Sequence, residues 1–189
     1  MARFPLLAPA LAIALLVGAT SCGDDGSTTS ADGSFVFGDD GEDATIPTVD
    51  PEAVGRSVAD VTVEAEDGSE VALGDYAGRP LVVNLYAQWC APCRAELPAF
   101  QEVHADLGDQ VAFLGVAVPP DLSAARRMAQ DAGVTYDLAE SPDGQVLVDL
   151  GAALLPVTAF VRADGTIAEL RSGGLDEAEL RKAIQELVA

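Results

Sequence analysis

Residues 84–93 read Asn84-Leu85-Tyr86-Ala87-Gln88-Trp89-Cys90-Ala91-Pro92-Cys93. The apolar first half predicts a buried strand, and the two cysteines fall three positions apart at the start of the helix that follows. Cysteines at this spacing on the first turn of a helix can form a disulfide with each other, and the helix N-terminus favours the thiolate form. The stretch therefore predicts a dithiol–disulfide switch at Cys90 and Cys93.

A permanent structural disulfide or a zinc site would also use two cysteines. Structural zinc takes a tetrahedral set of ligands, and the sequence adds only His104 and Cys22 to the pair. We therefore expect neither a metal nor another cofactor. His104, the single histidine, is expected at the surface or at an edge of the fold.

The composition indicates an apolar core and a strongly acidic surface. The 189 residues are 49% apolar, and 31 Asp and Glu against 10 Lys and Arg give a formal net charge of -21. This balance argues against a nucleic-acid partner, because binding phosphates requires a basic face. The many carboxylates are expected to form a solvated surface.

The first 21 residues resemble a bacterial lipoprotein signal peptide. Arg3 precedes an apolar run from Leu6 to Val17, which is shorter than the roughly 20 residues of a membrane span. Small residues then lead to Cys22, whose sulfur would carry the lipid after cleavage and tether the chain to the extracytoplasmic face of the cell membrane. An uncleaved signal anchor and plain secretion are the alternatives, and both also place the domain outside the cytoplasm.

Residues 22–50 are predicted to be an acidic, disordered linker between that anchor and a folded domain. Eight Asp and Glu fall in this stretch without a single Lys or Arg, and most other positions are Gly, Ser or Thr. Such a composition cannot bury enough apolar surface to fold, and its charges repel one another. The folded domain is therefore expected to span residues 51–189.

The hydrophobic pattern of residues 51–189 predicts strands that alternate with helices, followed by a terminal hairpin. A turn at Asp67-Gly68 joins two short strands at 61–63 and 71–73. The other expected elements are strand 81–86, helix 91–107, strand 111–118, helix 121–132, short helix 143–150, strands 157–161 and 167–170, and a helix from 176. Pro98 should kink helix 91–107, and the last helix should bury Leu180, Ile184, Leu187 and Val188. This order predicts an α/β fold in which helices cover both faces of a mixed sheet.

The cysteine motif within this order of elements resembles the thioredoxin superfamily. The similarity is strongest to the membrane-tethered extracytoplasmic thiol–disulfide oxidoreductases of the TlpA/ResA type, and it covers residues 54–189. It rests on the leading hairpin, on the run from Val82 to Pro98, and on Leu154-Leu155-Pro156-Val157-Thr158. A lone Cys-x-x-Cys is weak evidence, whereas the strand–turn–helix setting makes it specific. The resemblance implies a thioredoxin-like fold with an N-terminal β-hairpin extension.

The resemblance also implies a role for each cysteine. Cys90 would be the nucleophile, because it lies at the helix start and is more exposed than Cys93, which would be the resolving thiol. Attack by Cys90 on a substrate disulfide gives a mixed disulfide, which Cys93 then opens by attacking Cys90. The reverse sequence would oxidise a substrate instead.

Pro156 corresponds to the proline that this superfamily keeps in the cis form opposite the disulfide. A cis bond would leave the backbone of Leu155 free to pair with an extended substrate strand. Without the resemblance, an ordinary trans proline at the start of a strand would be expected. Related proteins often carry Gly where this chain has Leu154, so its substrate groove is expected to differ in shape.

Three further residues near the cysteines are candidates for the site. Glu96 lies one helical turn after the second cysteine, so it could accept that thiol's proton, with a pKa raised by burial; the alternative is a solvated glutamate. Trp89 would shape the docking surface or else fill the core. Pro92 sets the turn and removes a backbone donor beside the sulfur atoms. Together with Leu155 and Pro156, Trp89 and Pro92 are expected to contact substrate.

The expected function is disulfide exchange on exported proteins in the direction of reduction. The resemblance implies this direction and a role in cytochrome c maturation, with apocytochrome c among the substrates. Such a reductase would draw electrons from a membrane-embedded dithiol donor. A disulfide-forming oxidase, a peroxiredoxin-like peroxidase and a non-catalytic binding module are the alternatives. Peroxidases place a Thr-x-x-Cys nucleophile where this chain has Trp89 and Cys90.

Overall fold

The computed structural model of the protein describes residues 35–37, 44–46 and 48–189. The predicted signal peptide, Cys22 and most of the predicted linker lie outside these residues. Among the residues described, none of the helices combines the length and the hydropathy needed to cross a bilayer.

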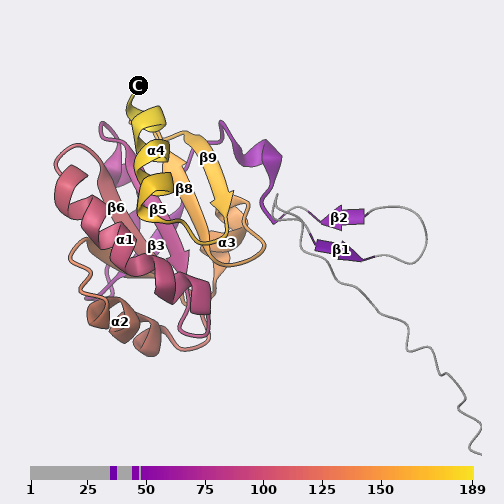
Figure 1. The fold of residues 1–189 in the computed structure, drawn as a ribbon, viewed down its shortest axis with the longest axis vertical. Coiled ribbons are helices and arrows are strands. Elements are labelled where there is room, and N and C mark those ends of the chain that lie inside the picture. Colours follow the sequence, from indigo (N-terminus) through magenta and orange to yellow (C-terminus); the bar gives the residue numbers. More distant parts are fainter. Residues whose placement is uncertain (1–34, 38–43, 47) are drawn as a thin grey trace, which may run out of the picture.

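A seven-stranded mixed sheet lies at the centre of the described domain (Figure 1). Its strands are β3 (Thr62–Ala65), β4 (Glu70–Ala72), β5 (Leu81–Tyr86), β6 (Ala112–Ala117), β7 (Asp137–Glu140), β8 (Val157–Val161) and β9 (Ile167–Ser172). They lie in the order β4-β3-β7-β6-β5-β8-β9. β5 pairs parallel with β6 and antiparallel with β8, which confirms the predicted mixed sheet.

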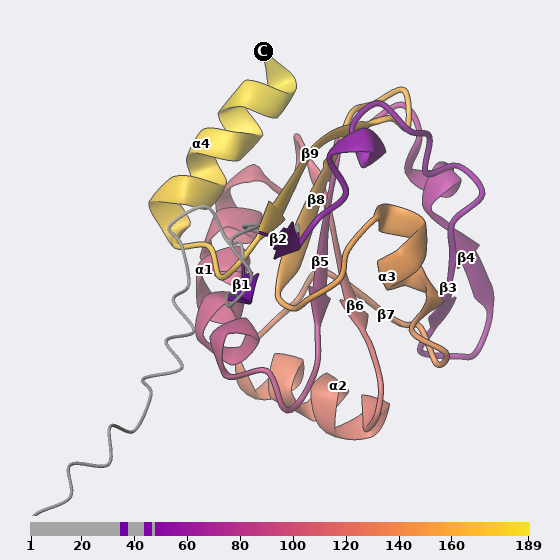
Figure 2. The ribbon, with the colours of Figure 1, turned by 90° about the vertical axis from the view of Figure 1, so that its right-hand side faces the viewer.

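Helices cover both faces of this sheet. They are α1 (Ala91–Leu107), α2 (Leu122–Asp131), α3 (Gln145–Leu150) and α4 (Glu177–Val188), with short 3-10 turns η1 (Pro51–Ala53) and η2 (Leu73–Tyr76). Figure 2 shows α1 and α4 side by side on one face and α3 on the other. The predicted helices on both faces are therefore confirmed. Pro98 lies inside α1, which runs on from Ala91 to Leu107 without ending there.

The core is built around β5, whose six residues are all buried. On one face Val82 belongs to a cluster with Phe100 of α1 and Ile184 of α4. On the other face Val83 belongs to a second cluster, to which α2, α3 and the β3–β4 hairpin contribute. A strand buried on both faces is expected to be largely apolar, and the sequence at 81–86 shows this pattern with Asn84 as the exception.

Two predictions from the hydrophobic pattern were wrong. β7 was missed because the sequence Asp-Leu-Ala-Glu is short and contains no β-branched or aromatic residue. Val188, predicted to be buried with Leu180, is 49% exposed. The reason is helix geometry, because a residue eight positions after Leu180 lies about 80° further around the helix, beside the buried stripe.

The chain joins the domain earlier than residue 51. Val49 forms an isolated β-bridge with Ala152. Two main-chain hydrogen bonds flank this bridge: the Ala153 N–H donates to the Thr48 carbonyl at 3.0 Å, and the Asp50 N–H donates to the Gly151 carbonyl at 2.7 Å. The main chain is therefore paired with the domain from residue 48. Further upstream, β1 (Phe35–Phe37) pairs antiparallel with β2 (Ala44–Ile46), so six residues of the predicted linker form strands.

Candidate active site

The junction between β5 and α1 positions the two cysteines. The buried strand ends at Tyr86, and Cys90 is the N-cap residue of α1, with its Sγ accepting a hydrogen bond from the Cys93 N–H at 3.2 Å. Pro92 lies in the first turn, where a missing N–H breaks no helical hydrogen bond. The sequence therefore starts the helix at the first cysteine and places the second one turn further in.

Cys90 and Cys93 form a disulfide, with their Cα atoms 5.2 Å apart, so the predicted pairing is confirmed. Cys90 is 3% exposed and Cys93 is fully buried, which makes Cys90 the outer sulfur. Both lie at the positive end of the α1 dipole, which stabilises a thiolate when the bond is open. The arrangement can therefore support reversible thiol–disulfide exchange.

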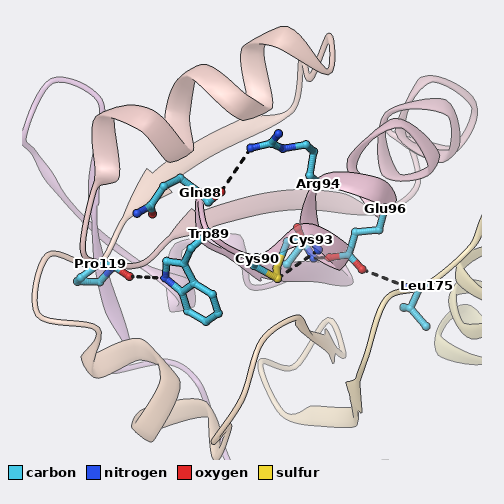
Figure 3. The surroundings of a disulfide bond; sticks show 9 residues. Gln88, Trp89, Cys90, Cys93, Arg94, Glu96, Pro119 and Leu175 are labelled. Atoms are coloured by element: carbon cyan, nitrogen blue, oxygen red, sulfur yellow. Dashed lines mark hydrogen bonds between the residues drawn. A yellow bond between two sulfur atoms is a disulfide. The ribbon is translucent and has the colours of Figure 1, made fainter. Parts of the chain in front are cut away.

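Glu96 is buried on the inner side of the disulfide, which rules out the alternative of a solvated glutamate. Its side chain is 3% exposed. The carboxyl accepts hydrogen bonds from Nδ2 of Asn84 at 2.8 Å and from the main-chain N–H of Leu175 at 3.1 Å. Figure 3 shows that Trp89 and Glu96 lie on opposite sides of the two sulfur atoms.

Burial raises the pKa of Glu96 from its ordinary 4.5 to about 7. The charged form loses its hydration in the core, and the hydrogen bonds from Asn84 and Leu175 recover only part of that loss. A carboxyl that titrates near neutral pH is present in both protonation states under ordinary conditions. It can therefore take up and release a proton, as a general base must.

Polar groups gather around Glu96 at the middle of the sheet. Asn84 is paired in register with Thr158 of β8 and with Gly115 of β6. Among the described residues, Oδ1 of Asn84 and Oγ1 of Thr158 are buried without a hydrogen-bond partner. A Cβ at Gly115 would lie only 3.2 Å from the Tyr136 ring, so a glycine at this position allows the ring to pack against the strand.

Pro156 follows a cis peptide bond with Leu155, as the resemblance implies. Pro156 is buried, and its carbonyl accepts a hydrogen bond from the Gly173 N–H at 2.9 Å. Within the described part of the chain, the N–H and C=O of Leu155 have no main-chain partner. The neighbouring Leu154 is 43% exposed, so an apolar side chain stands beside this open stretch of backbone.

Trp89 is a surface residue, which rules out the alternative that it fills the core. Its side chain is 61% exposed, and its indole N–H donates to the carbonyl of Pro119 at 3.3 Å. Arg94 is exposed beside it and donates to the carbonyl of Gln88 at 3.5 Å. His104 lies partly buried near the far end of α1, edge-on to aromatic rings, away from the first turn.

The sequence analysis missed the partners that hold Glu96. The sequence does mark Asn84 as unusual, because it is a polar residue in the buried strand 81–86, where the only other polar side-chain group is the hydroxyl of Tyr86. Leu175 acts through its main-chain N–H, which carries no sequence signal. The same holds for Gly173 and its hydrogen bond to Pro156.

Comparison with known proteins identifies the family. Residues 54–170 match the AhpC/TSA family. The chain belongs to this family. It is 26% identical over 136 residues to the thiol-disulfide oxidoreductase ResA of Geobacillus thermodenitrificans, an alignment that covers 71% of this chain and 78% of that protein.

Two solved structures give the same result. A DsbF homologue from Corynebacterium diphtheriae superimposes with a TM-score of 0.63 at 29% identity, covering 82% of this chain and all of that one. The pneumococcal exposed lipoprotein thioredoxin Etrx1 from Streptococcus pneumoniae does so with a TM-score of 0.58 at 27% identity, over 68% of this chain and all of that one. The protein is thus a thiol–disulfide oxidoreductase with a thioredoxin-like fold. The alternative prediction of a non-catalytic binding module is wrong.

Replacing Glu96 by Gln is expected to remove a pH dependence of stability. Because the pKa of this carboxyl is raised from 4.5 to about 7 on folding, the folded protein holds a proton that the unfolded chain has lost. Stability therefore falls as the pH rises through this window, by about 3 kcal/mol, and the loss is absent in Glu96→Gln. Urea unfolding at pH 5 and pH 8 measures it.

The matched control is Glu102→Gln, which neutralises an exposed glutamate on the same helix. Its stability should follow the wild-type dependence on pH. If Glu96→Gln also follows it, Glu96 does not titrate in the way described.

Proposed function

We propose that this protein reduces disulfides in exported proteins through Cys90 and Cys93, with Glu96 as the proton acceptor. The observation that carries the proposal is a buried carboxyl with a pKa of about 7 one helical turn from the inner cysteine. An oxidoreductase of this family needs two sulfur atoms of unequal reactivity and a place for a proton. The N-cap and the first two turns of α1 supply both.

The reaction consists of two exchanges. The Cys90 thiolate attacks one sulfur of a substrate disulfide, a mixed disulfide forms, and the other substrate sulfur leaves as a thiolate. Cys93 then attacks the sulfur of Cys90, and the second substrate sulfur leaves. The substrate gains two electrons and becomes a dithiol, while the protein is left with the Cys90–Cys93 disulfide seen in this structure.

The second exchange requires Cys93 to lose its proton inside the core. The side chain of Cys93 is fully buried, so water does not reach its sulfur directly. Burial raises the pKa of a thiol as it does that of a carboxyl. Glu96 lies three positions further along the same helical face and would accept this proton.

Substrate would bind across the open side of the disulfide. The unpaired main chain of Leu155 can accept an extended strand, with Pro156 behind it and Pro92 at the turn. Trp89 presents an exposed aromatic face on the side of the sulfur atoms that lies away from Glu96. Aromatic rings of this kind contribute large contact areas to protein interfaces.

The direction of reduction and a place in cytochrome c maturation, with apocytochrome c as a substrate, are what the sequence resemblance to the TlpA/ResA type implies. To act repeatedly, the protein must have its disulfide reduced by a dithiol donor embedded in the membrane. A disulfide-forming oxidase would use the same cysteines in reverse. A peroxidase is less well supported, because Ala87 stands where the Thr-x-x-Cys nucleophile motif requires threonine.

The cellular location follows from the N-terminal sequence. Residues 1–21 would be removed as a signal peptide, Cys22 would carry the lipid, and the predicted linker that follows it, up to where the chain joins the domain at residue 48, would tether the domain to the extracytoplasmic face of the membrane. One structural relative is itself an exposed lipoprotein, which supports this arrangement. A substrate would then be an exported protein.

Substitution of each cysteine should separate the two exchanges. Cys90→Ser is expected to lower insulin reduction with dithiothreitol to the uncatalysed rate. Cys93→Ser should instead accumulate a mixed disulfide with substrate, because the resolving thiol is missing. Non-reducing gels and insulin turbidity measure the two effects. Cys22→Ala, which leaves the pair intact, should retain the full rate, and insulin reduction by the Cys90→Ser protein would end the proposal.

The reduction potential of the pair distinguishes a reductase from an oxidase. A reductase is expected to lie near or below the thioredoxin value of about -270 mV, whereas an oxidase lies near about -120 mV. Equilibration with glutathione redox buffers, followed by alkylation and mass spectrometry, gives the value. A strongly oxidising result would reverse the proposed direction.

Replacement of Cys22 should release the protein from the membrane. In cells that express the full chain with a radiolabelled fatty acid, the wild type is expected to take up label and Cys22→Ala to take up none. The Cys90→Ser, Cys93→Ser double variant is the control and should be labelled normally. Equal labelling of the Cys22→Ala protein would contradict the lipid anchor.

A further inference from the structure

We propose that Gly174 is the opening through which Glu96 exchanges its proton with solvent. The inference rests on the proposed role of Glu96 as the proton acceptor for Cys93. A buried acceptor can work repeatedly only if its proton leaves again before the next cycle. The structure offers a route at the loop between β9 and α4.

This loop lies against the site at three consecutive residues. The Gly173 N–H donates to the carbonyl of Pro156 at 2.9 Å, and the Leu175 N–H donates to Oε2 of Glu96 at 3.1 Å. Gly174, between them, faces both Glu96 and Pro92. The main chain of the loop is thus held by hydrogen bonds on either side of Gly174.

A side chain at Gly174 would cover the carboxyl. Its Cβ would lie 3.7 Å from Oε2 of Glu96 and 3.8 Å from both Cβ and the carbonyl oxygen of Pro92. Gly174 is exposed, whereas Glu96 is 3% exposed. The space that the missing Cβ leaves therefore connects Oε2 with the surface.

The main chain does not explain why this residue is glycine. Gly173 has a φ of 95°, in the left-handed region that favours glycine, but Gly174 does not adopt such a φ. The distances of 3.7 and 3.8 Å are ordinary van der Waals contacts, so alanine fits without a clash. What alanine would change is the access of water to Glu96.

The other sides of Glu96 are closed. Nδ2 of Asn84 donates to Oε1 from β5, and the main-chain N–H of the buried Leu175 donates to Oε2. Tyr136, the residue before β7, is a further titratable neighbour, and its pKa is raised by burial and then by Tyr86 and the charge of Glu96, so it stays protonated. At the start of α4, the carboxylates of Asp176 and Glu179 each accept a hydrogen bond from the other residue's main-chain N–H, which caps the helix.

The proton then follows a balanced path. The S–H bond of Cys93 breaks, its proton forms an O–H bond on Glu96, and the sulfur electron pair forms the bond to Cys90 as the substrate thiolate leaves. In a second step the O–H bond breaks toward a water molecule beside Gly174. Glu96 returns to its carboxylate form, and solvent gains the proton.

The test introduces a side chain at position 174 and measures the titration of the Glu96 carboxyl. In purified protein labelled with carbon-13 at glutamate, the titration midpoint of Glu96 should rise by about half a pH unit in Gly174→Ala and by about one unit in Gly174→Val, because the charged form loses hydration. Ala178→Val, which enlarges an exposed residue in the first part of α4, should leave the midpoint unchanged. An unchanged midpoint in both Gly174 variants overturns the proposal.

A second measurement is the pH dependence of the reaction rate. The pH profile for resolving a preformed mixed disulfide should shift to higher pH in Gly174→Ala, and the shift should vanish in the Gly174→Ala, Glu96→Gln double variant. An equal shift in both backgrounds would mean that the new side chain obstructs substrate, which overturns the opening. A Glu96→Gln protein with the wild-type profile would instead overturn the proposed role of Glu96, while the carboxyl titration still reports on the opening.

Discussion

The start of α1 directly after the buried strand β5 is the constraint on which the site depends. β5 lies inside the sheet between β6 and β8, and only residues 87–90 separate its end at Tyr86 from the start of α1 at Ala91. Cys90 is the residue that caps this helix. The cap position gives its sulfur both the field of the helix and a hydrogen bond from Cys93.

In the proposed reaction, Glu96 connects this geometry to proton transfer. Burying a carboxyl lowers stability when it is charged, and the core offers it only the amide of Asn84 and the N–H of Leu175. Two hydrogen bonds leave the pKa near neutrality, between that of a solvated carboxyl and that of a fully isolated one. Glu96 thus combines a stability penalty with a protonation equilibrium that thiol exchange can use.

Three segments far apart in the chain meet at this point. Residues 84–96 carry the cysteines and Glu96, residues 154–156 carry the cis proline, and residues 173–175 close the inner side. The last segment is joined to the other two by main-chain N–H groups. Such contacts do not depend on side-chain identity, so the loop can support the site while keeping a glycine where access is needed.

Local pattern was enough to predict strand 81–86, helix 91–107 and the cysteine pair, because apolar periodicity and a spacing of three are properties of neighbouring residues. It missed β7, whose polar tetrapeptide is a strand only because β3 and β6 pair with it on either side. It also left open whether Glu96 was buried, since its partner Leu175 lies 79 positions away. Periodicity reports which face of an element is apolar, whereas the surroundings of one carboxyl depend on which distant backbone groups folding brings to it.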